Sequence, residues 1–198
     1  MRAFMTTRTS ARTVSCWALL LGLPLISEGV LRALYTQNSH TFEQRQSEVY
    51  GWFAVACLLL VLVARPLKLL RQRRMLGVSA FVFSAIHTWL AYQAVFDGDW
   101  ESMAFLSKPD WWATWAGIVA LIGFVPLTLT STNTAMRLMG KHWKTLHRLG
   151  PPLTLMALAH TLWMGVHFGL DPLKWTSVLL ILLTVVLFVW RTRKEKTA

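Results

Sequence analysis

Six long apolar runs recur along the chain, separated by short polar segments. They occupy residues 14–34, 50–64, 76–96, 112–130, 151–168 and 173–190. Runs of about 20 apolar residues are long enough to cross a bilayer, and in lipid a single segment satisfies its backbone only as a helix. The fifth run opens with two prolines, which a helix tolerates in its first turn. The pattern predicts an all-α membrane protein, a six-transmembrane-helix bundle in which residues 1–198 form a single integral membrane domain.

The distribution of Lys and Arg predicts how the bundle is oriented. Outside the apolar runs, three basic residues lie in the amino-terminal segment, five after the second run, four after the fourth and four in the tail. In the alternate segments there are three, namely Arg45, Lys108 and Lys174. Because cytoplasmic loops of membrane proteins concentrate Lys and Arg, we expect a multi-pass protein with both termini in the cytoplasm.

The composition excludes several classes of function. A net charge of +11 would suit nucleic acid, but nucleic-acid binding needs a soluble basic face, and here the basic residues alternate with apolar runs. We therefore expect the lipid bilayer, and no nucleic acid, as a partner. Cys16 and Cys57 both fall inside apolar runs, so neither a disulfide framework nor a zinc site is indicated. No motif suggests a Ser, His and Asp set for hydrolysis or group transfer.

Two histidines lie at matching depths inside apolar runs. His87 is eleven residues after Leu76, about 16 Å along a helix axis, and His160 is nine residues after Pro151, about 14 Å along its own. An unpaired polar ring in hydrocarbon is costly, so such a residue is a functional candidate. The shared depth suggests two rings facing each other across a flat macrocycle, with heme iron between them. The alternative is that each imidazole donates a hydrogen bond to a carbonyl of a neighbouring helix.

A second group of candidates lies near the expected cytoplasmic surface. His147 is thirteen residues before His160, about 20 Å lower on a continuous helix, although the prolines at 151 and 152 are expected to break that helix. Arg74 likewise lies thirteen residues before His87. His147 is therefore a candidate ligand of a second heme, and Arg73 and Arg74 are candidate partners of heme propionates or of an anionic flavin or quinone headgroup. Membrane topology alone is the alternative explanation of the arginines.

Specific motifs then carry a family resemblance. Residues 129–137 read Leu-Thr-Ser-Thr-Asn-Thr-Ala-Met-Arg, and residues 140–149 read Gly-Lys-His-Trp-Lys-Thr-Leu-His-Arg-Leu. Together they resemble the MsrQ (YedZ) family, the heme-binding membrane subunit of a periplasmic methionine sulfoxide reductase system, within the ferric-reductase-like transmembrane group. The stretch Arg73-Arg74-Met75-Leu76-Gly77 ahead of His87-Thr88, and the stretch His160-Thr161-Leu162-Trp163, are similar to that family's histidine motifs. The resemblance covers about residues 65–168.

The resemblance implies a six-helix bundle of the ferric-reductase-like type in a bacterial inner (cell) membrane. It places His87, His147 and His160 on three heme-linked histidines and Arg73 on a basic position near the lower heme. It further implies one or two b-type hemes, a quinol or flavin donor (FMN, quinone or a cytoplasmic flavin reductase) and a periplasmic molybdopterin-containing reductase as acceptor. Residues 35–50 depart from the family, because they lack the Gly-x-x-Asp-Pro-like turn expected between the first two spans.

Three functional readings remain open on the sequence. The leading one is an electron-transfer subunit, the second a stand-alone ferric or quinone reductase of the same fold, and the third a heme-free transporter or scaffold whose histidines serve protons or packing. A Gly-x-Gly-x-x-Gly turn is absent from the chain. We therefore expect electrons to arrive from a lipid-soluble carrier or from another protein rather than from a nicotinamide bound by this chain.

Overall fold

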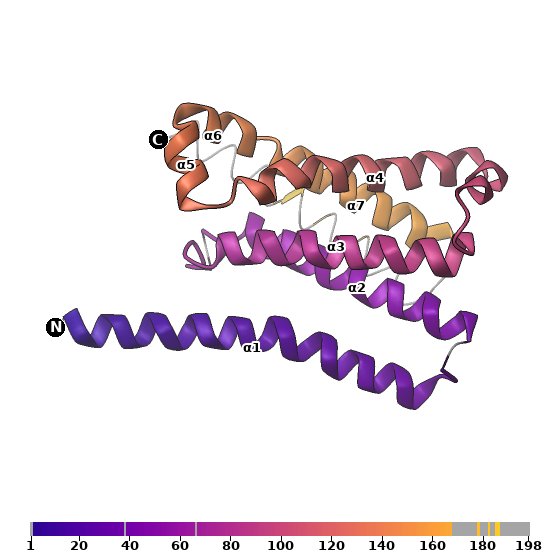
Figure 1. The fold of residues 1–198 in the computed structure, drawn as a ribbon, viewed down its shortest axis with the longest axis horizontal. Coiled ribbons are helices and arrows are strands. Elements are labelled where there is room, and N and C mark those ends of the chain that lie inside the picture. The colour runs from indigo at the N-terminus through magenta and orange to yellow at the C-terminus, as the bar shows by residue number, and fades with distance from the viewer. Residues whose placement is uncertain are drawn as a thin grey trace.

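The computed structural model describes residues 2–37, 39–65 and 67–167, together with positions 178, 182, 185 and 186. The described residues form α-helices and a short 3-10 helix joined by turns (Figure 1). In chain order these elements are α1 (Arg2–Leu34), α2 (His40–Leu62), α3 (Arg73–Phe96), η1 (Trp100–Phe105), α4 (Lys108–Leu129), α5 (Asn133–Met139), α6 (Lys141–His147) and α7 (Gly150–His167). The predicted all-α class is confirmed.

Four of the described helices are long and apolar enough to cross a membrane. They are Val14–Leu34 within α1, His40–Leu62, Arg73–Phe96 and Lys108–Leu129. These four correspond to the first four predicted spans. The fifth predicted span, 151–168, coincides with α7, which is not among the four, and the sixth, 173–190, lies outside the described residues except for its isolated positions.

The second helix begins ten residues earlier than its apolar run predicts. Ser39 caps α2 by accepting a hydrogen bond from the backbone N–H of Phe42 at 3.2 Å, and Glu43 lies in the first turn, where it favours the positive end of the helix dipole. The first turns of α2 are polar, so hydropathy alone placed the start at residue 50. The extension matters because it carries Ser47 to the level of the candidate site.

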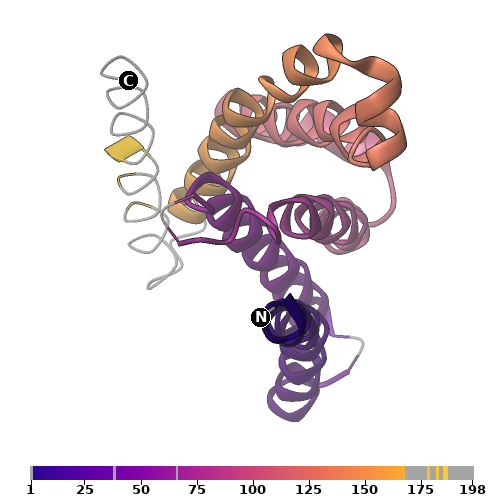
Figure 2. The same ribbon diagram turned by 90° about the vertical axis from the view of Figure 1, so that its left-hand side faces the viewer.

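The bundle is built from two helix pairs, α2 with α3 and α4 with α7, and α1 packs against α2 on the side away from α4 and α7 (Figure 2). Small side chains such as Ala54, Ala80 and Ala120 are buried between the helices, which lets their backbones approach closely. The main core cluster consists of Ala54, Cys57, Leu58, Leu76, Ala80, Phe83, Ala120, Phe124 and Leu127.

The polar connections are sorted by charge between the two ends of the bundle. The basic connection between α2 and α3 and the basic segment that forms α5 and α6 lie at the same end as the amino terminus (Figure 1). The connection between α1 and α2 and the acidic segment around η1 lie at the opposite end. This separation is the one that the charge pattern along the sequence predicts.

Glu28 links α1 to the rest of the bundle. Its carboxylate pairs with Arg32 at 2.9 Å, the expected ion pair at a spacing of four residues. The Gln46 side-chain amide of α2 also lies within hydrogen-bond distance of both Glu28 oxygens, at 3.0 and 2.8 Å. The charge inside the span is thus satisfied by two partners, one of which belongs to the next helix.

The helix break predicted by the two adjacent prolines is confirmed. Helix α6 ends at His147, and α7 begins at Gly150, so Pro151 and Pro152 occupy its first turn. A second break precedes α6, where Gly140 has φ +51° between α5 and α6. His147 and His160 therefore belong to separate helices, and the offset calculated for one continuous helix does not apply.

Candidate functional site

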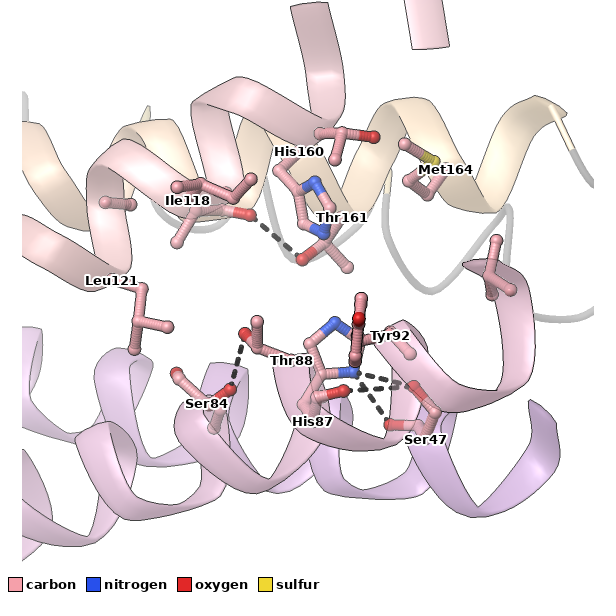
Figure 3. Close-up of a pocket in the computed structure, with 18 of the residues that line it drawn as sticks. Ser47, Ser84, His87, Thr88, Tyr92, Ile118, Leu121, His160, Thr161 and Met164 are labelled. Carbon is pink, nitrogen blue, oxygen red and sulfur yellow. Dashed lines mark hydrogen bonds between the residues drawn. The ribbon is translucent and has the colours of Figure 1, made fainter. Parts of the chain in front are cut away.

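A cavity of about 530 Å³ lies between the α2–α3 pair and the α4–α7 pair, with Trp100 and Phe105 of η1 among the residues that line it. Its volume falls in the range of cofactor and small-molecule sites, roughly 300–1,000 Å³. The walls are largely apolar, with Leu58, Leu121 and Phe124 among the lining residues. His87 from α3 and His160 from α7 project from opposite walls and point toward each other (Figure 3).

The two imidazoles are separated by the distance that one shared metal ion requires. Their ring centroids are 6.2 Å apart, with an angle of 69° between the ring planes. Two collinear metal–imidazole bonds of about 2 Å, each continued by about 1 Å to the ring centre, would place the centroids about 6 Å apart. The structure therefore brings together the two histidines that the sequence paired by depth.

Both rings are held by hydrogen bonds on their outer edges. The Nδ1 of His87 lies 2.8 Å from the backbone oxygen of Ser47, and the Nδ1 of His160 lies 2.8 Å from the backbone oxygen of Ala113. A carbonyl only accepts, so each Nδ1 carries the proton and each Nε2 keeps its lone pair free for a metal. The hydrogen bonding considered above as the alternative to ligation is present, and it is the arrangement that orients metal-ligating histidines.

The donor set of the site is two nitrogens. Among the described residues, no group of three or more His, Cys, Asp or Glu side chains is placed to hold a metal ion. A bare metal between His87 and His160 would thus lack most of its ligands. Heme iron already has four nitrogen ligands from the macrocycle and needs only one or two more from the protein. The residues present therefore fit heme better than a free ion.

Two glycines beside the histidines were missed by the sequence reasoning. A Cβ atom built on Gly51 of α2 would lie 3.0 Å from Nδ1 of His87, and one built on Gly117 of α4 would lie 2.9 Å from Nδ1 of His160. Glycine in the middle of a helix is unfavourable by about 1 kcal/mol relative to alanine. That cost is the signal in the sequence that could have marked both positions.

Asp110 is a further lining residue, one that the sequence analysis did not assign to the site. Its side chain is 7% exposed, and it accepts hydrogen bonds from the Ser107 hydroxyl at 2.5 Å and from Nε1 of Trp163 at 3.1 Å. The second bond joins α4 to α7, the helix that carries His160. Asp110 therefore fixes the wall of the cavity as well as lining it.

The structure brings together only in part His147, Arg73 and Arg74, the candidates for a second heme near the cytoplasmic surface. His147 is half-buried, and its pKa is lowered by that burial and then by the positive charges of Arg73 and Arg74. The amino-terminal end of α3 thus lies close enough to α6 for the three charges to interact. Arg74 also donates a hydrogen bond to the Asn133 side chain at 2.7 Å, which ties α3 to α5.

The His147 ring itself is engaged by its neighbours. It stacks on Trp143 with 4.1 Å between ring centroids, and its Nε2 lies 3.1 Å from the Thr130 hydroxyl. That hydroxyl already donates to the backbone oxygen of Pro126 at 2.6 Å, so Nε2 of His147 is the donor to Thr130. The His147 ring is thus held by Trp143 of its own helix and by Thr130 at the end of α4.

The fold and the site define a multi-pass, all-α membrane protein with two facing histidines in a cavity between helix pairs. The chain belongs to the family described as "Ferric reductase like transmembrane component", which matches residues 50–158. The matched segment contains His87 and His147 and ends two residues before His160.

Relatives of the chain carry a more specific description. The "Protein-methionine-sulfoxide reductase heme-binding subunit MsrQ" of Herminiimonas arsenicoxydans is 33% identical over 136 residues, 66% of this chain and 61% of that protein. The proteins of the same name from Azospira oryzae and Bordetella pertussis are 34% and 31% identical, over 67% and 73% of this chain and 60% and 74% of their own lengths. The chain therefore spans about three fifths of the first two relatives, and the family resemblance seen in the motifs is confirmed. No solved structure matches the chain significantly.

Proposed function

We propose that this protein is the heme-carrying membrane subunit of a periplasmic methionine sulfoxide reductase system. The observation that carries the proposal is the facing pair His87 and His160, with ring centroids 6.2 Å apart and both Nδ1 atoms occupied by backbone carbonyls. The names of the relatives, which describe heme-binding subunits, support the same interpretation.

The residues of the cavity define what the bound group can do. A b-type heme, when bound, supplies reversible one-electron exchange at its iron. His87 and His160 would hold the heme through their Nε2 atoms, and an iron held by two histidines would carry electrons rather than bind oxygen or a substrate. The lining is largely apolar and includes Leu58 and Phe124, which disfavours water beside the bound group. The arrangement therefore favours electron transfer over chemistry on a ligand of the iron.

We further propose six transmembrane helices with both termini in the cytoplasm. Electrons would enter from a quinol or a flavin donor and leave toward a periplasmic molybdopterin-containing reductase. Support comes from the sorting of basic segments to one end of the bundle and acidic ones to the other (Figure 1). A reporter fused after Ala198 and found active only in the periplasm would contradict this orientation.

A second heme near the cytoplasmic end is proposed with His147 as one ligand and Arg73 or Arg74 beside its propionates. Its support is the concentration of positive charge around a half-buried histidine, together with the family resemblance. Because Nε2 of His147 is bonded to Thr130, ligation through that atom requires this hydrogen bond to break. We therefore expect this heme to be the more weakly held of the two.

The decisive experiment is heme quantification per chain on protein purified in detergent, with reduced-minus-oxidised spectra. The wild type should show a low-spin b-type signal, and His87→Ala and His160→Ala should each lose most of it. His40→Ala is the matched control, because His40 is exposed at the start of α2 and should retain the signal. A wild type without a reducible heme band, or full heme retention in both single variants, would refute the proposal.

The family description favours one alternative, a stand-alone ferric or quinone reductase of the same fold. Chelated ferric iron or a soluble quinone, added to the dithionite-reduced protein with no partner present, separates the two functions. Rapid oxidation by either acceptor at rates that saturate with its concentration would favour the reductase. Oxidation only by a periplasmic reductase would favour the electron-transfer subunit.

A further inference from the structure

Helices α2 and α4 present the same local arrangement to the two facing histidines. In α2, the backbone oxygen of Ser47 accepts from His87, and Gly51 follows four residues later. In α4, the backbone oxygen of Ala113 accepts from His160, and Gly117 follows four residues later. Each histidine therefore donates a hydrogen bond to the other helix of its own pair. The accepting carbonyl belongs to residue i of that helix, and residue i+4 is a glycine.

The spacing has a physical reason. In an α-helix the carbonyl of residue i already accepts from the N–H of residue i+4, so a second donor must approach it from the side. The Cα–Cβ bond of each helical residue tilts toward the amino-terminal end, which places the Cβ of residue i+4 beside that carbonyl. Glycine at i+4 removes this atom and opens the carbonyl to a ring from another helix.

The distances show that the space is used by the rings. A Cβ on Gly51 would lie 3.0 Å from Nδ1 and 3.2 Å from Cε1 of His87. A Cβ on Gly117 would lie 2.9 Å from Nδ1 and 3.1 Å from Cε1 of His160. Contacts this short force the neighbouring ring to give by tenths of an ångström, so a Cβ at either position would disturb the ring that carries the Nδ1 hydrogen bond.

We propose that Gly51 and Gly117 are positioning residues for the two axial ligands. By leaving the carbonyls of Ser47 and Ala113 uncovered, they set the Nδ1 hydrogen bond of each histidine, and with it the orientation and basicity of Nε2. This inference rests on the proposed function, because it assumes that a heme is held between His87 and His160. A hydrogen-bonded Nδ1 makes the imidazole a stronger donor to a metal and favours the oxidised iron.

Alanine at either glycine tests the proposal. Gly51→Ala and Gly117→Ala should each lower heme content at least about twofold. Disturbing the hydrogen-bond partner of a metal-ligating histidine typically lowers the affinity for the metal about 10–100-fold. The heme that remains should show a raised midpoint potential and altered low-spin g-values in electron paramagnetic resonance. If the glycines made no contact with the rings, alanine would stabilise the helices, because it is the better helix former, and the potential and g-values would not change.

Two glycines of the same bundle serve as controls. Gly22 of α1 has open space around its Cβ position, so Gly22→Ala should leave heme content, potential and g-values unchanged. A Cβ on Gly123 of α4 would lie 2.5 Å from Leu153 of α7, and its three nearest atoms all belong to that leucine. Gly123→Ala therefore disturbs the α4–α7 packing alone, and it should change stability without moving the potential.

The possible outcomes distinguish failure of the proposed function from failure of the role assigned to the two glycines. A wild type without heme defeats the proposed function, whereas unchanged potentials and g-values in heme-loaded Gly51→Ala and Gly117→Ala defeat only the role of the glycines. If neither alanine variant accumulates, electron–nuclear double resonance on the wild type provides a second measurement. A hydrogen-bonded proton on Nδ1 of both axial imidazoles supports the proposal, and its absence from either one overturns it.

Discussion

The hydrogen bond between Trp163 and Asp110 offers a quantitative test of how α7 is held against α4. Trp163→Phe removes the Nε1–H donor, which lies 3.1 Å from the Asp110 carboxylate, and retains an aromatic ring. The Trp163 side chain is 46% exposed, so the substitution changes little buried apolar area. The effect on stability therefore reports mainly the loss of one hydrogen bond.

The expected magnitude follows from the burial of the acceptor. Asp110 is 7% exposed, so water cannot readily replace the lost donor. Removing the donor of a buried acceptor costs about 1–3 kcal/mol, and the Ser107 hydroxyl still bonds the other carboxyl oxygen. We expect a loss of about 2 kcal/mol in the free energy of unfolding, roughly a 30-fold change in the ratio of folded to unfolded protein.

The assay is equilibrium unfolding in detergent micelles, with Trp112→Phe as the control. Trp112 lies on α4 and is 68% exposed, so its substitution should change stability by no more than about 0.5 kcal/mol. Combining Trp163→Phe with Asp110→Ala in a double-mutant cycle isolates the pairwise term. The reasoning is refuted if Trp163→Phe costs no more than Trp112→Phe, or if the coupling to Asp110 is close to zero.

Two further predictions follow from the histidine environments. Ser47→Ala keeps the backbone carbonyl that orients His87 and deletes a hydroxyl 3.2 Å from Nδ1, so it should cost about 1 kcal/mol of stability and leave the heme spectrum in place. Loss of the heme signal in this variant would show that the hydroxyl, and not the carbonyl, holds the ring. The pKa of His147 lies below its ordinary value of 6.5, because of partial burial and the charges of Arg73 and Arg74. The unfolded chain then binds more protons in the window below about pH 6.5, so stability should fall as the pH drops through that window. His147→Gln should flatten the dependence of the melting temperature on pH there, and an equally steep profile in the variant would contradict the assignment.

Local properties of the sequence were sufficient for the first four apolar helices, the separation of charge and the pairing of His87 with His160. Apolar length predicts a membrane-crossing helix wherever it occurs, and a fixed rise per residue turns sequence position into depth. The break before α7 was also predictable, because proline in a first turn is a local rule. The start of α2 at His40 was not, because a polar helix end that packs against neighbours has no hydropathy signal.

The sequence by itself determined which side chains lie midway along the predicted spans, because that position depends only on the segment that carries the residue. The tertiary structure alone decided what each of them meets there. Ser47 lies 40 residues from His87 and Ala113 lies 47 residues from His160, so the carbonyls that orient the rings are fixed by how α2 packs on α3 and α4 on α7. The same packing determines the role of Gly51 and Gly117, because the absence of a Cβ matters only where a side chain of another helix lies against the glycine.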